Sequence, residues 1–173
     1  MIPKIKKILY VTDLTKNSAY AFFYATDIAK RYNAKIIIIH SIENICYAYD
    51  DGRGSFQVGE ILATAKKQDR NTDIEEIKKG IQEFCKRTDT QMGGPCVELV
   101  SKIIIPLGNP VEEILKAADE ENCDAIVLGT HGMGFLRQTF LESVVGSVLQ
   151  RTRKPVFVIP LPSEKTNIDW DKF

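Results

Sequence analysis

The sequence predicts an α/β fold, an open and doubly wound parallel sheet of about five strands, and three observations support it. Five short apolar runs rich in β-branched residues alternate with stretches of helical period along the 173-residue chain. Runs such as KIIIIHSI and AIVLG are apolar without alternation, as strands are when helices cover both faces of a parallel sheet. Right-handed crossovers between successive strands then place the helices on the two faces.

The predicted strands are apolar runs that end at polar or turn-forming residues. The third run is longer and half alternating, which is typical of a strand at the edge of a sheet. The five predicted strands are Lys7–Val11, Lys35–Ile42, Glu98–Pro106, Asp124–Leu128 and Val156–Ile159.

The first two helices are predicted from apolar residues that recur at helical spacing. The stretch Asn17–Tyr32 repeats alanine and isoleucine in this way, and Asn33 is suited to the left-handed conformation that ends a helix. In Asp73–Arg87, three isoleucines and Phe84 form one apolar face. Charged residues four apart on the other side are expected to form ion pairs. These expected pairs are Glu75–Lys79 and Glu83–Arg87.

The last two helices are predicted from a capping motif and from a short apolar stripe. Asn109 is a cap residue, Pro110 takes the first helical position, and Glu112 stands three after the cap. The final helix is expected over Ser143–Arg151, because its valines and Leu149 are apolar and Lys154-Pro155 follows.

Two segments fall outside this alternation. The polar connection 43–72 contains DDGRGSFQVGE and is too long for a tight turn, so we expect a mobile flap with a short helix at Gly59–Lys67. The tail 163–173 carries Trp170 and Phe173, which could dock on the body or on a partner. The length fits one domain, so residues 1–162 form the predicted domain and 163–173 the tail.

Charge and hydropathy exclude several classes of partner. The chain has 23 Lys and Arg against 23 Asp and Glu, so it lacks the basic surface of a general nucleic-acid or membrane binder. Purely apolar runs such as Ile36–Ile39 are far short of the ~20 residues that span a bilayer. The N-terminus has no apolar stretch of signal-peptide length. We therefore expect a cytoplasmic protein.

The cysteines and histidines do not form a metal or redox motif. Zinc and thioredoxin-like sites need close ligand pairs, which the spacing does not provide, and a disulfide framework is not expected without secretion. The cysteines are instead expected to be small buried residues. His40 is expected to be hydrogen-bonded at a strand end, while a functional role for His131 is left open. The four cysteines are Cys46, Cys85, Cys96 and Cys123.

A glycine-rich loop follows the fourth predicted strand. In Leu128–Gly134, three glycines let the backbone approach a ligand, and the N–H groups of the next helix could hold a phosphate. In open α/β sheets, ligands bind beyond the carboxyl ends of the strands where the strand order reverses. Tight turns also produce such glycines, so the loop alone is weak evidence.

Several stretches together resemble the universal stress protein family over nearly the whole chain. They are ILYVTDLTKNSAYAFFYATDIAK, KIIIIHSIE, GNPVEEILKAADEENCDAIVLGTHG and KPVFVIP. The resemblance implies a Rossmann-like fold of the adenine nucleotide alpha-hydrolase type and a homodimer paired through Val156–Ile159. The family has two groups: one binds ATP through Gly-x2-Gly-x9-Gly-Ser/Thr, and the other lacks that pattern.

The resemblance also implies a set of nucleotide-binding residues. Asp13 would face the adenine and ribose side, although a cap on the following helix is an equally open role. Ser41 would meet the adenine through its backbone. The implied binding residues are Val11, Thr12, Asp13, Ser41, Leu128, Gly129, Gly132, Ser143 and Val144.

The chain departs from the ATP pattern at its third glycine, where Glu142 stands. A carboxylate ~4 Å from a phosphate charge, at an effective dielectric near 20, costs about 4 kcal/mol and weakens binding roughly a thousandfold. A negative charge at this position stabilises the folded protein by about 0.3–1 kcal/mol if a helix begins at Ser143. Our hypothesis is that Glu142 fills the anion site, unless Arg53 or Arg137 neutralises it.

These features predict a stress-response homodimer that binds ATP or AMP with an altered phosphate half-site, with Mg²⁺ present only alongside nucleotide. The alternative is an interaction module that holds no nucleotide and acts on a protein partner. No P-loop and no Gly-x-Ser-x-Gly elbow occurs, so no catalytic residues are assigned and an enzyme is not expected. Slow hydrolysis of bound ATP is left open.

Overall fold

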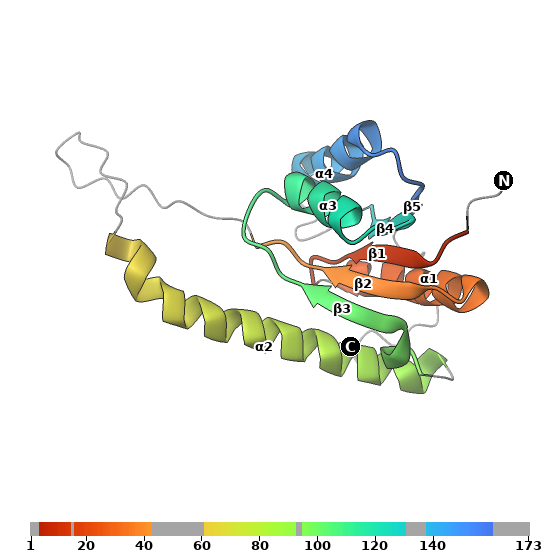
Figure 1. Cartoon of the computed structure of the whole chain (residues 1–173), viewed down its shortest axis with the longest axis horizontal. Helices are drawn as coiled ribbons and strands as arrows, with labels where there is room; N and C mark the ends of the chain where they lie inside the picture. The colour runs from red at the N-terminus through yellow and green to blue at the C-terminus, as the bar shows by residue number, and fades with distance from the viewer. Residues whose placement is uncertain (1–3, 15, 43–60, 93–94, 131–137, 161–173) are drawn as a thin grey trace.

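The computed structural model describes residues 4–14, 16–42, 61–92, 95–130 and 138–160 (Figure 1). Strands and helices alternate along the chain, as the sequence predicts. In chain order they are β1 (Lys7–Val11), α1 (Lys16–Tyr32), β2 (Lys35–Ile39), α2 (Ile61–Met92), the short 3₁₀ helix η1 (Val97–Leu99), β3 (Val100–Ile104), α3 (Pro110–Glu120), β4 (Ala125–Gly129), α4 (Gln138–Arg151) and β5 (Val156–Ile159).

The five strands form one parallel sheet in the order β3-β2-β1-β4-β5. This order confirms the predicted open α/β fold and places β3 at an edge, as its half-alternating pattern indicates. The order reverses between β1 and its neighbour β4, so the topological switch point lies at the centre of the sheet. The loops after these two strands therefore meet at one position.

Three strands differ at their ends from the predicted ranges. β3 spans Val100–Ile104 rather than Glu98–Pro106, because the chain before it forms the 3₁₀ helix η1. The ends of β2 and β4 differ for other reasons. Beyond Ile39 the chain stays bonded to the β3 side, since His40 N–H donates to Ile104 O, but β1 has already turned away. The strand therefore ends three residues before the predicted Ile42. Asp124 lies just before β4 because its carboxylate accepts the amide hydrogens of Lys6 and Lys7, at 2.7 and 2.9 Å.

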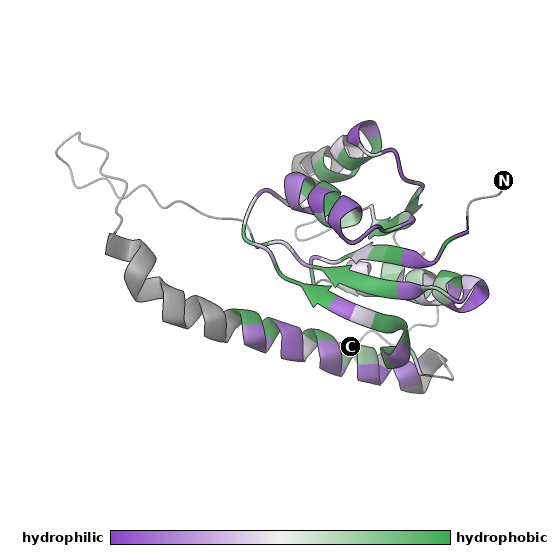
Figure 2. Ribbon diagram, viewed as in Figure 1, coloured by the Kyte–Doolittle hydropathy of each residue, from purple (hydrophilic) through white to green (hydrophobic). Residues whose placement is uncertain are grey.

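Helices α1 and α2 cover one face of the sheet. Tyr10 and Phe22 lie at the centre of this layer, with ring centroids 5.1 Å apart, and Phe84 of α2 packs on Phe22 at 5.3 Å. Figure 2 shows the hydrophobic residues of the second half of α2 on the side toward the sheet and the hydrophilic ones turned outward. Asn33 ends α1 with φ of 53°, which confirms its left-handed role.

Helices α3 and α4 cover the other face, over a core of aliphatic side chains from β1, β2 and β4. Asn109 caps α3 as predicted: its side chain accepts from the amides of Val111 and Glu112, and Pro110 takes the first position. Glu112 also receives a two-pronged hydrogen bond from Arg151 of α4, which joins the two helices at the surface. An apolar core and the ion pair between Arg151 and Glu112 therefore hold α3 and α4 together.

Helix α2 differs most from the prediction. It runs without a break over 32 residues from Ile61 to Met92, so the expected short helix at Gly59–Lys67 is wrong as a separate element. No proline stands within this range, and a continuous helix keeps every interior backbone group bonded. The remainder of the predicted flap, 43–60, and the tail lie outside the described residues. Neither expected ion pair forms among the described side chains; Glu75 pairs with Lys78 instead, at 2.9 Å.

The described cysteines are buried, as predicted. Burial raises the pKa of the Cys85 thiol to about 12 and that of the Cys123 thiol to about 11, and the pKa of the Cys96 thiol also rises. Cys46 and His131 lie outside the described part of the chain. Within that part, no helix is long and apolar enough to cross a membrane, and no three metal-binding side chains gather.

Candidate functional site

The candidate site begins where β1 ends, between β2 and β4. β1 stops at Val11, whose register partner in β2 is Ile39. On one side the β2 chain continues to an isolated bridge between Ile42 and Leu107. On the other side Thr130 N–H still donates to Ile159 O at 2.9 Å. Beyond Val11 the chain of β1 leaves the sheet, while the chains on both sides stay bonded to their outer neighbours. We call the region past this end of β1 the gap.

The peptide groups of Ser41 face this gap. Along a parallel strand, successive residues direct their N–H and C=O groups alternately to the two neighbouring strands. Ile39 O accepts from Thr12 N on the β1 side, whereas the amides of His40 and Ile42 donate to the β3 side. The peptide groups of Ser41 consequently point to the β1 side, beyond the point where β1 has ended.

The same alternation turns the peptide groups of Gly129 toward the gap from the β4 side. The amides of Ile126 and Thr130 donate to the β5 side, at 2.9 Å each, so Gly129 turns its N–H and C=O toward β1. β1 pairs with β4 only as far as Tyr10 and Val127. Two sets of backbone donors and acceptors therefore face one space, an arrangement that suits a flat ring with edge hydrogen-bonding groups.

Thr12 holds the end of β1 in place, and every polar group it has is engaged. Its N–H donates to Ile39 O at 3.0 Å, and its carbonyl lies 2.9 Å from His40 Nδ1. Its hydroxyl accepts from Leu14 N at 3.0 Å and lies 2.9 Å from the Ser18 hydroxyl. The side chain expected to line an adenine slot is thus turned toward α1. Its contact with His40 confirms that the histidine is hydrogen-bonded at a strand end.

Asp13 follows Thr12 at the mouth of the gap and is partly buried. Its position is set by the turn around it, because Leu14 adopts φ of 65° and bonds back to Thr12. Ser18, which the sequence reasoning did not single out, anchors this turn from α1. A serine in the first turn of a helix is common, so only the fold reveals this role.

The apolar side of the gap comes from the α3/α4 face. Leu128 is 3% exposed in this core, and Val11 and Val144 pack against it. Ser41 also bonds to this end of the molecule, since its hydroxyl donates to Gly108 O at 3.2 Å. Of the predicted site residues, Thr12, Asp13, Ser41 and Gly129 thus lie at the carboxyl ends of β1, β2 and β4, and Val11, Leu128 and Val144 belong to or pack on the core of the α3/α4 face.

The phosphate side differs from the expectation. Gly132 lies outside the described residues, and α4 begins at Gln138 rather than near Ser143, so the predicted start of this helix is wrong. Glu142 is a good helix former where the family pattern has a glycine, and nothing in QTFLES stops the helix. Glu142 thus stands fifth in α4, beyond the first turn where an anion gains most from the helix dipole.

The longer helix also changes which backbone donors are free. Only the first four N–H groups of a helix lack a partner within it. In α4 these belong to Gln138–Leu141, about 7 Å along the axis from the start expected at Ser143. The amides of Ser143 and Val144 lie further along the helix and bond within it. A phosphate cradle built from these two amides is therefore not formed.

Comparisons with known proteins agree with this fold. The sequence model of the universal stress protein family matches residues 4–160. Universal stress protein MJ0577 of Methanocaldococcus jannaschii is 28% identical over 158 residues, which cover 89% of this chain and 94% of that relative. A solved structure of MJ0577 superposes with a TM-score of 0.68 at 27% identity, covering 94% of this chain and 100% of that one.

Two further solved structures of this fold hold adenine nucleotides. A universal stress protein in complex with cAMP has a TM-score of 0.54 and 20% identity, with 91% of this chain and 98% of that chain covered. The universal stress protein from Archaeoglobus fulgidus in complex with dAMP has a TM-score of 0.51 and 19% identity, with 90% and 97% covered. At these identities the likeness shows a shared fold.

Proposed function

The chain belongs to the universal stress protein family, and from this premise we propose that it is a stress-response protein that binds an adenine nucleotide through the adenine and ribose half alone. AMP and ATP are then comparable ligands, because the residues that would distinguish them by their phosphates are altered. The site is the gap beyond the end of β1.

The observation that carries the proposal is the convergence of Ser41 and Gly129. Both direct backbone N–H and C=O groups into the gap, and an adenine edge offers complementary donors and acceptors. Leu128 and Val11 supply an apolar surface for the ring from the α3/α4 side. Asp13 at the end of β1 is placed to accept a ribose or adenine hydrogen bond. A polar rim over an apolar floor is the usual make-up of a small-ligand site.

The fold neighbours support adenine as the recognised part. One of them holds cAMP and another dAMP, which have one phosphate each and the same base. For this chain the helical placement of Ser143 and Val144 removes two phosphate donors, and Glu142 adds a negative charge to the same turn. Both changes weaken the contribution of a triphosphate and leave the adenine contacts unchanged.

Two variants at Glu142 test the proposal by isothermal titration with AMP and with ATP and Mg²⁺. Glu142→Gln removes the charge and keeps a good helix former, whereas Glu142→Gly also frees the backbone. We expect wild type to bind AMP and ATP with similar affinity. If the charge lies near the phosphates, Glu142→Gln should tighten ATP binding by up to about a thousandfold and leave AMP binding nearly unchanged.

The backbone variant then separates the two causes. Glu142→Gly should tighten ATP binding beyond Glu142→Gln if the amides of Ser143 and Val144 become available as donors. Wild-type protein that binds neither AMP nor ATP would overturn the proposal. Wild type that binds ATP far more tightly than AMP would overturn the part assigned to Glu142.

A second candidate is a non-nucleotide interaction module, and the continuous helix through Glu142–Val144 is the observation that favours it. In that case a denaturing extract of purified protein contains no adenine nucleotide, and no variant at Glu142 binds AMP. Nucleotide chromatography of the extract distinguishes the two functions.

We also propose a cytoplasmic homodimer that is not an enzyme and whose partners are proteins rather than nucleic acid or membrane. β5 (Val156–Ile159) lies at one edge of the sheet, and an open apolar edge favours pairing with a second copy. Light scattering of wild type and of Val158→Pro tests the oligomeric state. A monomeric wild type would contradict the dimer.

A further inference from the structure

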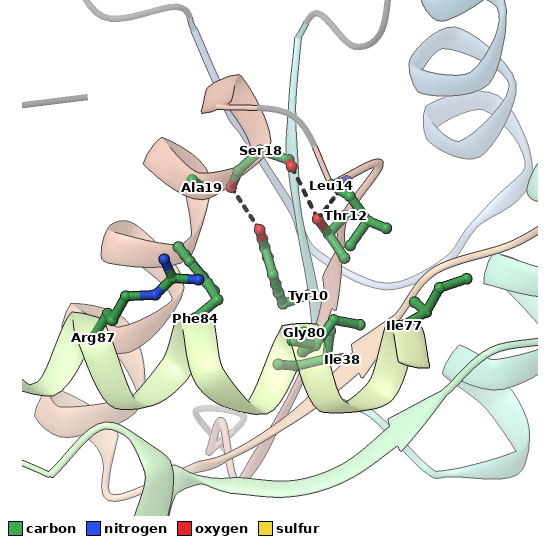
Figure 3. A pocket seen from close by; sticks show the side chains of 11 residues that line it. Tyr10, Thr12, Leu14, Ser18, Ala19, Ile38, Ile77, Gly80, Phe84 and Arg87 are labelled. Atoms are coloured by element: carbon green, nitrogen blue, oxygen red, sulfur yellow. Dashed lines mark hydrogen bonds between the residues drawn. The ribbon is translucent and has the colours of Figure 1, made fainter. Parts of the chain in front are cut away.

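A separate pocket of about 280 Å³ lies on the α1/α2 face, between the beginning of α1, the end of β1 and the middle of α2 (Figure 3). Its floor is the sheet side chains Tyr10 and Ile38, and one wall is a stripe of α2. Most lining residues are apolar, and hydroxyls and one cation complete the wall. Its described lining residues are Tyr10, Thr12, Leu14, Ser18, Ala19, Ile38, Ile77, Gly80, Ile81, Phe84 and Arg87.

This pocket is distinct from the proposed nucleotide site. The side chains of Tyr10 and Ile38 belong to the core under α1 and α2, whereas Val11 and Leu128 belong to the core under α3 and α4. Successive side chains of a strand point to opposite faces, so β1 presents one residue set to each cavity. Among the described residues, Thr12 belongs to both the pocket and the proposed nucleotide site, and its hydroxyl points to the pocket side.

At Gly80 the pocket wall borders open space, and no bulky neighbouring side chain fills it. Glycine lowers helix stability relative to alanine, and Gly80 stands in the interior of α2. A Cβ built at this position meets no atom within 4 Å. The glycine is therefore not needed to let another element approach closely. Its missing side chain leaves room at the pocket wall.

Leu14 gives a second, independent sign at the mouth of the pocket. Its φ of 65° is in the left-handed region, where a bulky side chain is strained, and such strain gathers at ligand sites. The side chain is nevertheless 49% exposed, so no burial in the protein compensates for the strain. An apolar ligand in the pocket would cover Leu14 and supply that burial.

The charges around the pocket set the chemistry and the direction of a ligand. Arg87 is the one charged side chain among the described lining residues, and its expected partner Glu83 does not pair with it. At the other end, Asp13 follows Thr12. An anionic group is therefore favoured at Arg87 and disfavoured near Thr12.

We propose that this pocket binds a small amphipathic carboxylate, with its apolar body between the sheet and Gly80 and its carboxylate paired with Arg87 at the edge of α2. The volume is near the lower end of small-molecule sites, which suits a medium-length alkyl chain or one aromatic ring. Binding here needs no nucleotide, so it is independent of the function proposed for the gap beyond β1.

The test uses decanoate and decanol as probes, titrated calorimetrically into the full-length protein. We expect decanoate to bind and decanol to bind more weakly, because only decanoate can pair with Arg87. Gly80→Leu should fill the pocket and reduce decanoate affinity by about tenfold or more. The matched control is Gly146→Leu in α4, where a Cβ also meets no atom within 4 Å and no pocket wall is altered. It should leave affinity within about twofold.

The charge is tested by a second pair of variants. Arg87→Gln should weaken decanoate binding by about threefold or more and leave decanol binding unchanged. Lys79→Gln makes the same charge change on α2 outside the described pocket lining and should have no such effect. The proposal is overturned if wild type binds neither probe, or if Gly80→Leu and Gly146→Leu bind decanoate equally. Equal losses in Arg87→Gln and Lys79→Gln would overturn the pairing with Arg87.

Discussion

The phenol of Tyr10, near the end of β1, donates a hydrogen bond of 2.6 Å to the backbone carbonyl of Ser18 in the first turn of α1. Both residues are buried, and the Tyr10 ring also packs on Phe22 one turn further along the helix. The bond sets where α1 begins relative to the sheet. The turn that carries Thr12, Asp13 and Leu14 is held between these two anchored points, and so are both proposed sites.

The substitution Tyr10→Phe tests this anchor. It removes the hydroxyl but keeps the ring, so the loss is one buried hydrogen bond. We expect the free energy of unfolding in urea to fall by about 1–2 kcal/mol. The matched control is Tyr24→Phe, because the Tyr24 hydroxyl bonds to that of Tyr20 at the surface, at 3.1 Å. Equal losses in both variants would show that the Ser18 bond is not special.

Stability is also expected to decrease at alkaline pH. Burial holds the pKa of Cys85 at about 12 and that of Cys123 at about 11, against an ordinary value of 9.0. The unfolded chain therefore releases these protons first. The full contribution is present below about pH 9 and is lost as pH rises toward the folded values, by up to about 1.4 kcal/mol per pH unit for each thiol. The pKa of Tyr10 is raised as well and acts in the same direction at higher pH.

Urea unfolding under reducing conditions at about pH 8 and about pH 10 measures this loss. Cys123→Ala is the control, since alanine has no proton to release and fits a site that is 2% exposed. Its stability should decrease less steeply between the two pH values than that of wild type. The same slope in both proteins would show that the Cys123 thiol does not contribute.

Asp124 is expected to be important for stability although it lies outside the strands. Its carboxylate accepts the amide hydrogens of Lys6 and Lys7 at the beginning of β1. Asp124→Ala leaves these amides without that acceptor and should lower the free energy of unfolding by about 1–3 kcal/mol. Asp124→Asn keeps a neutral acceptor and should lose less. Thermal or urea unfolding of the two variants checks the order, and a reversed order would contradict it.

The sheet could be predicted from sequence because its three central strands are largely buried on both faces. The bounds of Lys7–Val11 and Val156–Ile159 agree with the prediction, since each apolar run is as long as the strand it forms. Asn109 likewise predicts the beginning of α3, because a cap residue followed by proline acts through local backbone chemistry. Features that depend on a few neighbouring residues are therefore the ones that sequence alone reveals.

The features that sequence missed depend on residues far apart in the chain. The beginning of α2 at Ile61 carries no cap signal, and the polar stretch KKQDRNTD follows its first turn. The pocket exists only because α1 and α2 pack at a certain spacing, so Gly80 alone could not predict it. The beginning of α4 was placed at Ser143 from its apolar stripe, although Glu142 itself favours a helix. Glu142 was interpreted through its charge, whereas the structure places it inside a continuous helix.

The helical backbone around Glu142 predicts slow hydrogen exchange at the amides of Ser143 and Val144. In wild type both amides lie inside α4 and should exchange about a hundredfold more slowly than unprotected amides. Glu142→Gly places a glycine at the fifth position of the helix, which costs about 1 kcal/mol relative to alanine and favours fraying of the first turns. Exchange at both amides should then become about fivefold faster. Two-dimensional NMR of deuterium-exchanged samples measures each amide.

Two controls separate this local effect from a general loss of stability. The amide of Val148, a fully buried residue further along α4, should exchange at the same rate in wild type and Glu142→Gly. Glu142→Gln keeps a good helix former and should preserve the slow exchange at Ser143. If Ser143 and Val144 exchange at unprotected rates in wild type, the helix begins later than Gln138. Their amides would then be available to a phosphate, and the charge of Glu142 would be the sole obstacle to ATP.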